Sequence, residues 1–195
     1  MYKSFLKTAI DIILSICGVI VLAIPMVIIA IAIKMESKGP ALFKQRRLGK
    51  GQKEFTVYKF RTMCDHAFEK GGVASSESDN RITKVGKFLR KTSLDELHQM
   101  FNILKGEMAI IGPRPILPFE FDDYKDNARY AHRYDAKPGM FCTVDIDLRA
   151  TATREQQFEM DADYVDKMSF GLDCKVFFGI IKTVITGKNV YKEQA

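Results

Sequence analysis

The most constraining feature of this chain is a long apolar segment near its N-terminus. Between Lys7 and Lys34 the only charged side chain is Asp11, and most other residues are Ile, Leu, Val or Ala. A helix needs about 20 consecutive apolar residues to cross the hydrocarbon of a bilayer, and residues 12–33 meet that length. A cleaved signal peptide has an apolar core of only about 7 to 15 residues. The segment therefore predicts a permanent membrane anchor.

Pro25 and the flanking charges bear on how this anchor sits in the bilayer. A proline inside a helix removes one backbone hydrogen bond and its ring clashes with the preceding turn, so we expect a bend at Pro25. Basic residues favour the cytosolic side, and they occur on both flanks (Lys3, Lys7, Lys34, Lys38, Lys44, Arg46, Arg47, Lys50 and Lys53). A re-entrant helix broken near Pro25 and a simple kinked span both follow from these residues.

The remainder of the chain has the composition of one soluble domain, so we divide the chain into residues 1–36, inserted in the membrane, and 37–195. The formal net charge of the 195 residues is +6, which indicates an acidic partner such as anionic lipid or nucleotide phosphate. We expect no nucleic-acid partner, because basic and aromatic residues do not interleave in a binding motif. The four cysteines lack the spacing of a metal site or a disulfide framework (Cys17, Cys64, Cys142 and Cys174).

The periodicity of this domain predicts a mixed α/β fold. Residues 41–43 and 54–60 read as the strands of a short hairpin or sheet around a glycine-rich turn, and residues 69–80 read as a polar loop. Helical spacing then predicts several helices (from Ile82 to Lys91, from Ser93 to Leu104 and from Cys174 to Ile185). The first of these is basic and amphipathic. It could lie on an anionic membrane surface or pack on the core.

Two adjacent acids, Asp95 and Glu96, stand where the second of these helices begins. Ser93 and Glu96 have the spacing of a capping box, in which Glu96 reaches back to the amide of Ser93. A functional hypothesis uses the same residues: a carboxylate that attacks a phosphoanhydride must stay ionised, and nearby cations favour the ionised form. The second carboxylate could then bind Mg²⁺, a hard cation that prefers oxygen ligands. The spacing alone leaves capping and catalysis open.

Among the basic residues, Arg114 is the strongest candidate for binding a phosphate. Prolines on both sides fix its backbone, and its planar guanidinium suits bidentate contact with phosphate. Arg61, at the end of a predicted strand, is a weaker candidate. The three histidines have neither metal-ligand spacing nor a nucleophile signature, so we assign them no role.

Several ordered blocks of the sequence resemble the small monotopic phosphoglycosyl transferases, which are bacterial sugar transferases. The similarity includes the apolar segment with Asp11 and Pro25, and then five blocks (residues 39–49, 59–63, 79–86, 88–97 and 111–115). It implies an enzyme at the cytosolic face of the bacterial cytoplasmic membrane, with a re-entrant helix and both termini in the cytosol. The partners it implies are a UDP-sugar, polyprenyl (undecaprenyl) phosphate and membrane lipid.

The resemblance also implies residue roles. Asp95 attacks the diphosphate of the UDP-sugar, UMP leaves, and polyprenyl phosphate accepts the sugar-1-phosphate from the phospho-aspartate. Glu96 is the catalytic partner that works with Mg²⁺, and Arg90 and Arg114 fall on arginines that handle phosphate. This reaction would start the assembly of an exopolysaccharide, an O-antigen or a glycoprotein glycan. A homo-oligomer is compatible with it.

One loop departs from the pattern of this family. Many members carry Pro-Gly-Ile-Thr-Gly where this chain has Pro138-Gly139-Met140-Phe141-Cys142, and Asp145 replaces an amide. Arg149 still fits the family as a residue that binds substrate phosphate. The departures put nucleotide or sugar contacts of this loop in doubt. They also leave an alternative, in which the chain is a catalytically silent, membrane-anchored scaffold.

Overall fold

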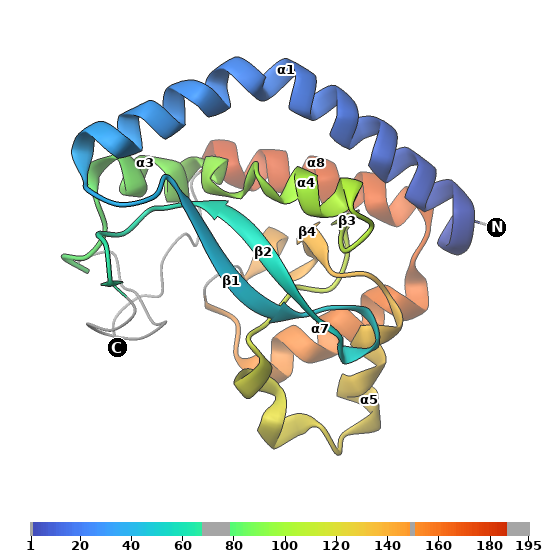
Figure 1. Ribbon diagram of the computed structural model, residues 1–195. Coiled ribbons are helices and arrows are strands. Elements are labelled where there is room, and N and C mark those ends of the chain that lie inside the picture. The colour runs from blue at the N-terminus through green and yellow to red at the C-terminus, as the bar shows by residue number, and fades with distance from the viewer. Residues whose placement is uncertain (1, 68–78, 149–150, 187–195) are drawn as a thin grey trace.

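The computed structural model describes residues 2–67, 79–148 and 151–186 (Figure 1). Most of the predicted loop at 69–80, and the candidate Arg149, lie outside these residues. Within these residues, four short strands form two separate two-stranded sheets among the helices, so the predicted mixed α/β class is confirmed. The elements used below have the following bounds: α1 Lys7–Glu36, β1 Leu42–Leu48, β2 Glu54–Phe60, α3 Lys84–Thr92, α4 Gln99–Leu104, β3 Ala109–Ile111, α5 Ala128–Ala131, β4 Gly139–Phe141, α6 Val144–Asp147, α7 Arg154–Lys167 and α8 Phe170–Thr186.

The apolar segment forms one continuous helix, α1, that extends beyond the predicted range at both ends. Pro25 lies inside this helix, so the break expected there does not interrupt the helical backbone. Figure 1 shows α1 as an arch over α3 and α4. A proline removes only one backbone hydrogen bond, and a bend accommodates that loss without ending the helix.

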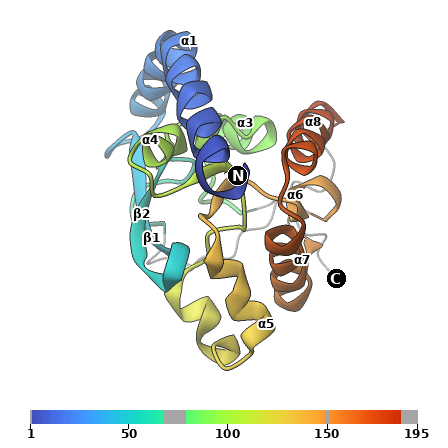
Figure 2. The same cartoon turned by 90° about the vertical axis from the view of Figure 1, so that its right-hand side faces the viewer.

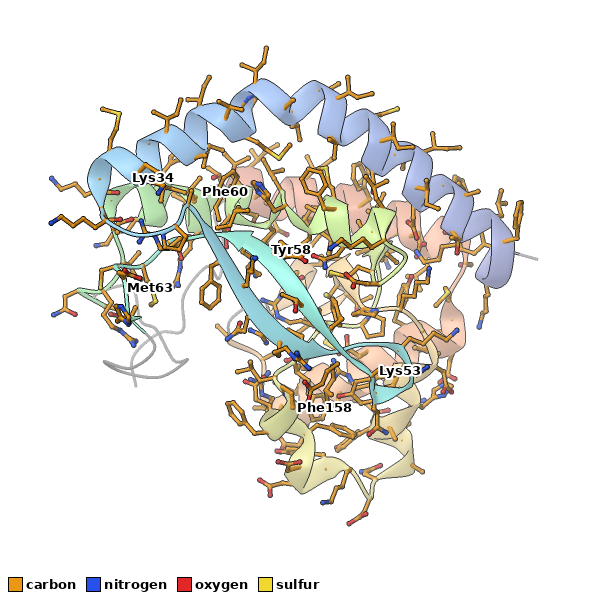
Figure 3. The ribbon with its side chains drawn as sticks, in the orientation of Figure 1. Lys34, Lys53, Tyr58, Phe60, Met63 and Phe158 are labelled. Atoms are coloured by element: carbon orange, nitrogen blue, oxygen red, sulfur yellow. The ribbon has the colours of Figure 1, made fainter. Side chains whose placement is uncertain are left out.

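The two faces of α1 have different surroundings. Its inner face packs on the domain through Met26 and Ile33, in a cluster that includes Phe60, Leu89 and Leu97. Figure 3 shows side chains radiating from the convex side of the arch. The exposed side chains of α1 include a row of apolar ones (Ile20, Val21, Ile24, Val27 and Ile28). By length and composition α1 is able to cross a membrane. Contiguous apolar side chains exposed on a protein surface are typical of a site that contacts a membrane or another protein.

Both ends of α1 are attached to the same domain. At the N-terminal end, the ammonium of Lys7 lies 2.6 Å from the carboxylate of Asp173 in α8. At the C-terminal end, the carboxylate of Glu36 accepts hydrogen bonds from the first amides of α3, at 2.7 and 2.9 Å. Such a carboxylate complements the positive end of a helix. The same domain therefore fixes the positions of both helix ends.

The predicted hairpin is present and longer than expected, because β1 continues to Leu48 and pairs with β2 in antiparallel register. Phe60, at the end of β2, lies under the C-terminal half of α1, whereas Phe158 of α7 lies in a second cluster on the far side of the hairpin (Figure 3). The hairpin thus passes between the layer that contains α1 and the layer that contains α5 and α7 (Figure 1).

A second, parallel pair of strands was not predicted. β3 pairs with β4, with Ala109 opposite Gly139 and Ile111 opposite Phe141. A Cβ atom on Gly139 would lie 2.1 Å from the amide nitrogen of Gly112, so the two backbones can approach this closely only with glycine. The carboxyl ends of parallel strands meet at one edge of a sheet, and the chain segments that follow β3 and β4 therefore meet there.

Candidate active site

Asp95 and Glu96 lie in a single 3₁₀ turn, Leu94–Glu96, between α3 and α4. Of the two alternatives, the capping box is not formed, because the Ser93 side chain makes no capping hydrogen bond. Ser93 has a left-handed backbone (φ 57°) at the end of α3, and its amide donates to the carbonyl of Arg90 at 3.3 Å. The helix expected from Ser93 begins only at Gln99. The turn leaves the Glu96 carboxylate to bind another partner.

That partner is Lys59 of β2, a residue that the sequence analysis missed. Its ammonium lies 2.6 Å from Oε1 of Glu96, and both side chains are mostly buried. The contact arises because β2 runs beside the turn that carries the acids, although Lys59 and Glu96 are 37 residues apart in the chain. The only sequence signal was the position of Lys59 at the start of a block shared with the resembling family.

The surroundings of Asp95 raise the pKa of its carboxyl towards neutral pH. Burial raises the pKa of Asp95 and the neighbouring charge of Glu96 adds to the rise, while Lys59 and Arg90 lower it; the net result is a pKa of about 6. A group with this pKa is mostly ionised at pH 7 but more basic than an ordinary aspartate. These properties suit a carboxylate nucleophile.

Arg90 is positioned by the close packing of α3 on the segment after β2. Its Nε donates to Oγ1 of Thr62 at 2.9 Å. A Cβ atom on Gly86, one turn earlier in α3, would lie 1.9 Å from the carbonyl oxygen of Thr62. Glycine at this position therefore brings the last turn of α3, and with it Arg90, beside Asp95.

The turn that contains Arg114 is held from three sides. Its amide donates to the carboxylate of Asp161 at 3.1 Å, and its carbonyl accepts a hydrogen bond from Arg133. Arg133 and Asp161 form an ion pair that is almost completely buried, 2.5 Å apart. Arg47 of β1 donates to the carbonyl of Pro115 at 3.2 Å. Neither Arg47 nor Arg133 was singled out from the sequence, and both act here by holding the backbone of the turn.

The side chain of Arg114 pairs with Asp145, one of the departures in the atypical loop. The guanidinium lies 2.6 Å from Oδ1 of Asp145, and the other carboxylate oxygen accepts the amide of Cys142 at 3.1 Å. This ion pair follows from the parallel strands, because Arg114 follows β3 and Asp145 follows β4. The Arg114 side chain is 40% exposed, which leaves part of its guanidinium accessible to a phosphate.

Arg61 occupies a different environment from the other candidates. Its Nη2 donates to the carbonyl of Ser37 at 2.9 Å, and its Nη1 donates to the carbonyl of Lys38. The contacts described for Arg61 therefore fasten the chain just after α1. Its predicted role in phosphate binding stays a prediction, as does that of Arg149, which lies outside the described residues.

A site for Mg²⁺ was assigned to Glu96 from the sequence. Within the described residues, no group of three or more His, Cys, Asp and Glu side chains gathers as a metal site. Mg²⁺ usually keeps several waters and binds through one or two carboxylates together with substrate phosphates. The adjacent carboxylates of Asp95 and Glu96 fit that donor set, so the assignment to Glu96 is compatible with the structure.

The chain matches the family model described as bacterial sugar transferase over residues 2–187. The chain belongs to this family. It is 41% identical over 170 residues to the UDP-glucose:undecaprenyl-phosphate glucose-1-phosphate transferase of Caulobacter vibrioides, covering 83% of this chain and 63% of that protein. It is 35% identical over 188 residues to the UDP-N-acetylgalactosamine-undecaprenyl-phosphate N-acetylgalactosaminephosphotransferase of Aeromonas hydrophila, covering 94% of this chain and 44% of that protein.

A Bacillus subtilis protein named uncharacterized sugar transferase EpsL is 38% identical over 158 residues, which are 81% of this chain and 76% of that protein. This chain therefore spans about half to three quarters of the length of these relatives. Each of these matches covers most of this chain.

Proposed function

We propose that this chain is a membrane-bound phosphoglycosyl transferase. It moves a sugar-1-phosphate from a UDP-sugar to polyprenyl (undecaprenyl) phosphate, releases UMP, and so begins the assembly of an exopolysaccharide, an O-antigen or a glycoprotein glycan. The observation that carries the proposal is the carboxyl of Asp95, which is partly buried between cations and has a pKa of about 6. The activities after which its relatives are named support the choice of substrates.

In the first step, the Asp95 carboxylate attacks the phosphorus that bears the sugar. The bond from that phosphorus to the bridging oxygen breaks, and its electrons leave with UMP. In the second step, a phosphate oxygen of the polyprenyl phosphate attacks the same phosphorus and the Asp95 carboxylate is released. Each step substitutes one oxygen for another at phosphorus, so no redox partner is needed.

The surrounding side chains act chiefly through charge, because phosphoryl transfer depends on positioning and on neutralising the phosphate oxygens. Arg90 lies beside the nucleophile, and Arg114 on its rigid turn offers a guanidinium that can exchange Asp145 for a substrate phosphate. Lys59 is a positioning residue that holds Glu96 and lowers the pKa of Asp95. When bound at Glu96, Mg²⁺ would supply a further positive charge to the diphosphate.

We infer a re-entrant topology for α1, at the cytosolic face of the bacterial cytoplasmic membrane. Lys7 at one end of α1 contacts α8, and Glu36 at the other end contacts α3, so both ends attach to one domain. A domain that remains on one side of the bilayer requires both ends on that side. The exposed apolar row of α1 would then enter one leaflet, and the basic flanks would face anionic headgroups.

The test is UMP release by the purified protein in nanodiscs, with Mg²⁺, polyprenyl phosphate and a panel of UDP-sugars. We expect turnover with at least one donor and its loss in Asp95→Asn. The matched control is Asp126→Asn, which changes an exposed aspartate elsewhere in the chain. A folded wild-type protein that releases no UMP with any donor would contradict the proposal and support the scaffold alternative.

A further inference from the structure

An apolar groove of about 440 Å³ lies between α1, α4 and α8. Its floor consists of Ile110 from β3 and of Met140 and Phe141 from β4, and α8 contributes Phe177 and Ile181 to one wall. Figure 2 shows α1 and α4 on one side of the molecule and α8 on the other. The volume lies within the range of about 300 to 1,000 Å³ that is common for small-molecule sites.

The groove reaches the candidate active site. Ser93 and Leu94, the two residues before Asp95, belong to its lining, as does Leu97 one residue after Glu96. At the α8 wall the groove opens outward, since 42% of Ile181 and 79% of Ile185 are exposed. It thus connects the nucleophile turn with an apolar face of the molecule. Such a groove fits an amphiphile whose apolar chain lies along it and whose charged head lies at Asp95.

We propose that the groove holds the part of the polyprenyl chain nearest the phosphate of the acceptor. This inference rests on the proposed function and adds a subsite to it. The cations Lys59 and Arg90, which act on Asp95, complement a phosphate head at that end of the groove. Because apolar side chains bind apolar chains by removing their surface from water or headgroups, the lining selects a hydrocarbon occupant over a nucleotide or a sugar.

The groove also gives the atypical loop a role. Met140 and Phe141 stand where many members of the resembling family carry isoleucine and threonine, and both side chains line the groove. Phe141 thereby adds a large apolar surface to the floor. The departures at these two positions consequently affect the fit of the acceptor chain. The doubt about donor contacts applies instead to Asp145, which binds Arg114.

Two variants and one control test this subsite in the full chain in nanodiscs. Ile181→Trp narrows the groove and Phe141→Thr removes apolar surface from its floor. Phe178→Trp is the matched control, because Phe178 lies on α8, is 65% exposed and is not part of the lining. We expect the KM for polyprenyl phosphate to rise roughly tenfold in both groove variants, the usual size of such effects in apolar pockets, and to stay unchanged in the control.

The burst of UMP formed from the UDP-sugar without acceptor separates this inference from the proposed function. The burst should be equal in the wild type and in all three variants, because the groove does not hold the donor. An unchanged KM for the acceptor in both groove variants of an active enzyme would overturn the subsite. A wild type without a burst would overturn the proposed function.

Photo-crosslinking tests the subsite without turnover. The probe is a diazirine-labelled prenyl phosphate, added to the wild type without UDP-sugar, and the crosslinked peptides are mapped by mass spectrometry. We expect crosslinks in β4 and α8. Their yield should fall when unlabelled prenyl phosphate is added and stay the same when phosphatidylglycerol is added. Crosslinks confined to other segments, or equal competition by phosphatidylglycerol, would overturn the proposal, and the latter would identify the groove as a general lipid site.

Discussion

Replacing Lys59 by methionine should move the acidic limb of the pH–rate profile to higher pH. Lys59 is the cation that lowers the pKa of Asp95 most, and burial keeps that pKa raised to about 6 even with Lys59 present. An opposite charge at close range lowers the pKa of a carboxyl by roughly 1 to 3 units. Loss of Lys59 should therefore raise the pKa of Asp95 to about 7 or above, taking the smallest of these shifts.

The consequence for rate follows from the ionised fraction of the nucleophile. If the pKa rises from about 6 to about 7, kcat/KM should fall about twofold at pH 7 and about fivefold at pH 6 from ionisation alone. The assay is UMP release between pH 5 and pH 9. Lys59→Arg retains the charge and should keep the limb near pH 6, and Lys53→Met removes an exposed lysine as a further control. An acidic limb that stays in place in Lys59→Met would refute this account of Asp95.

Three further predictions concern stability and topology. Asp95→Asn should raise the free energy of unfolding at pH 7 by up to about 3 kcal/mol, because the raised pKa makes the wild type lose stability as pH rises from about 4 to about 6. Urea titrations at pH 4.5 and pH 7 measure this difference. An equal effect of the substitution at both pH values would contradict the prediction. Arg133→Met should destabilise the fold by about 3 to 5 kcal/mol, because it leaves Asp161 charged and buried. Adding Asp161→Leu should recover most of the lost stability. No recovery in thermal melts of the double variant would argue against the ion pair. For topology, a single cysteine is placed at Lys3 or at Ser37 in a chain whose native cysteines are replaced by serine. Both positions should react with an impermeant maleimide only in inside-out vesicles. Labelling of one position from the opposite side of the membrane would indicate a span.

The sequence predicted those parts of the fold that depend on local patterns. The apolar run that became α1, the strands that flank a glycine-rich turn, and the basic helix from Lys84 all follow from periodicity over neighbouring residues. In that basic helix Leu89 is buried and Phe88 is exposed. The two alternatives for it, packing on the core and contact with a membrane, are thus both compatible with its faces.

The parts that were missed depend on contacts between distant segments. The parallel pairing of β3 with β4 brings Arg114 to Asp145, and no pattern within either segment indicates it. The capping box failed for a similar reason, because the ion pair with Lys59 and the left-handed end of α3 at Ser93 outweigh the local motif. Asp95 and Glu96 are adjacent in the chain, but their partners are visible only in the tertiary structure.

The most direct test of the account is a search for the covalent intermediate on Asp95. The purified chain is incubated with a reactive UDP-sugar and Mg²⁺ without acceptor, quenched in acid and analysed by intact and peptide mass spectrometry. The account predicts an adduct with the mass of a sugar phosphate on the peptide that contains Asp95, which disappears when polyprenyl phosphate is added and is absent from Asp95→Asn. Product formation without an adduct on this peptide, or with an adduct on another residue, would contradict it.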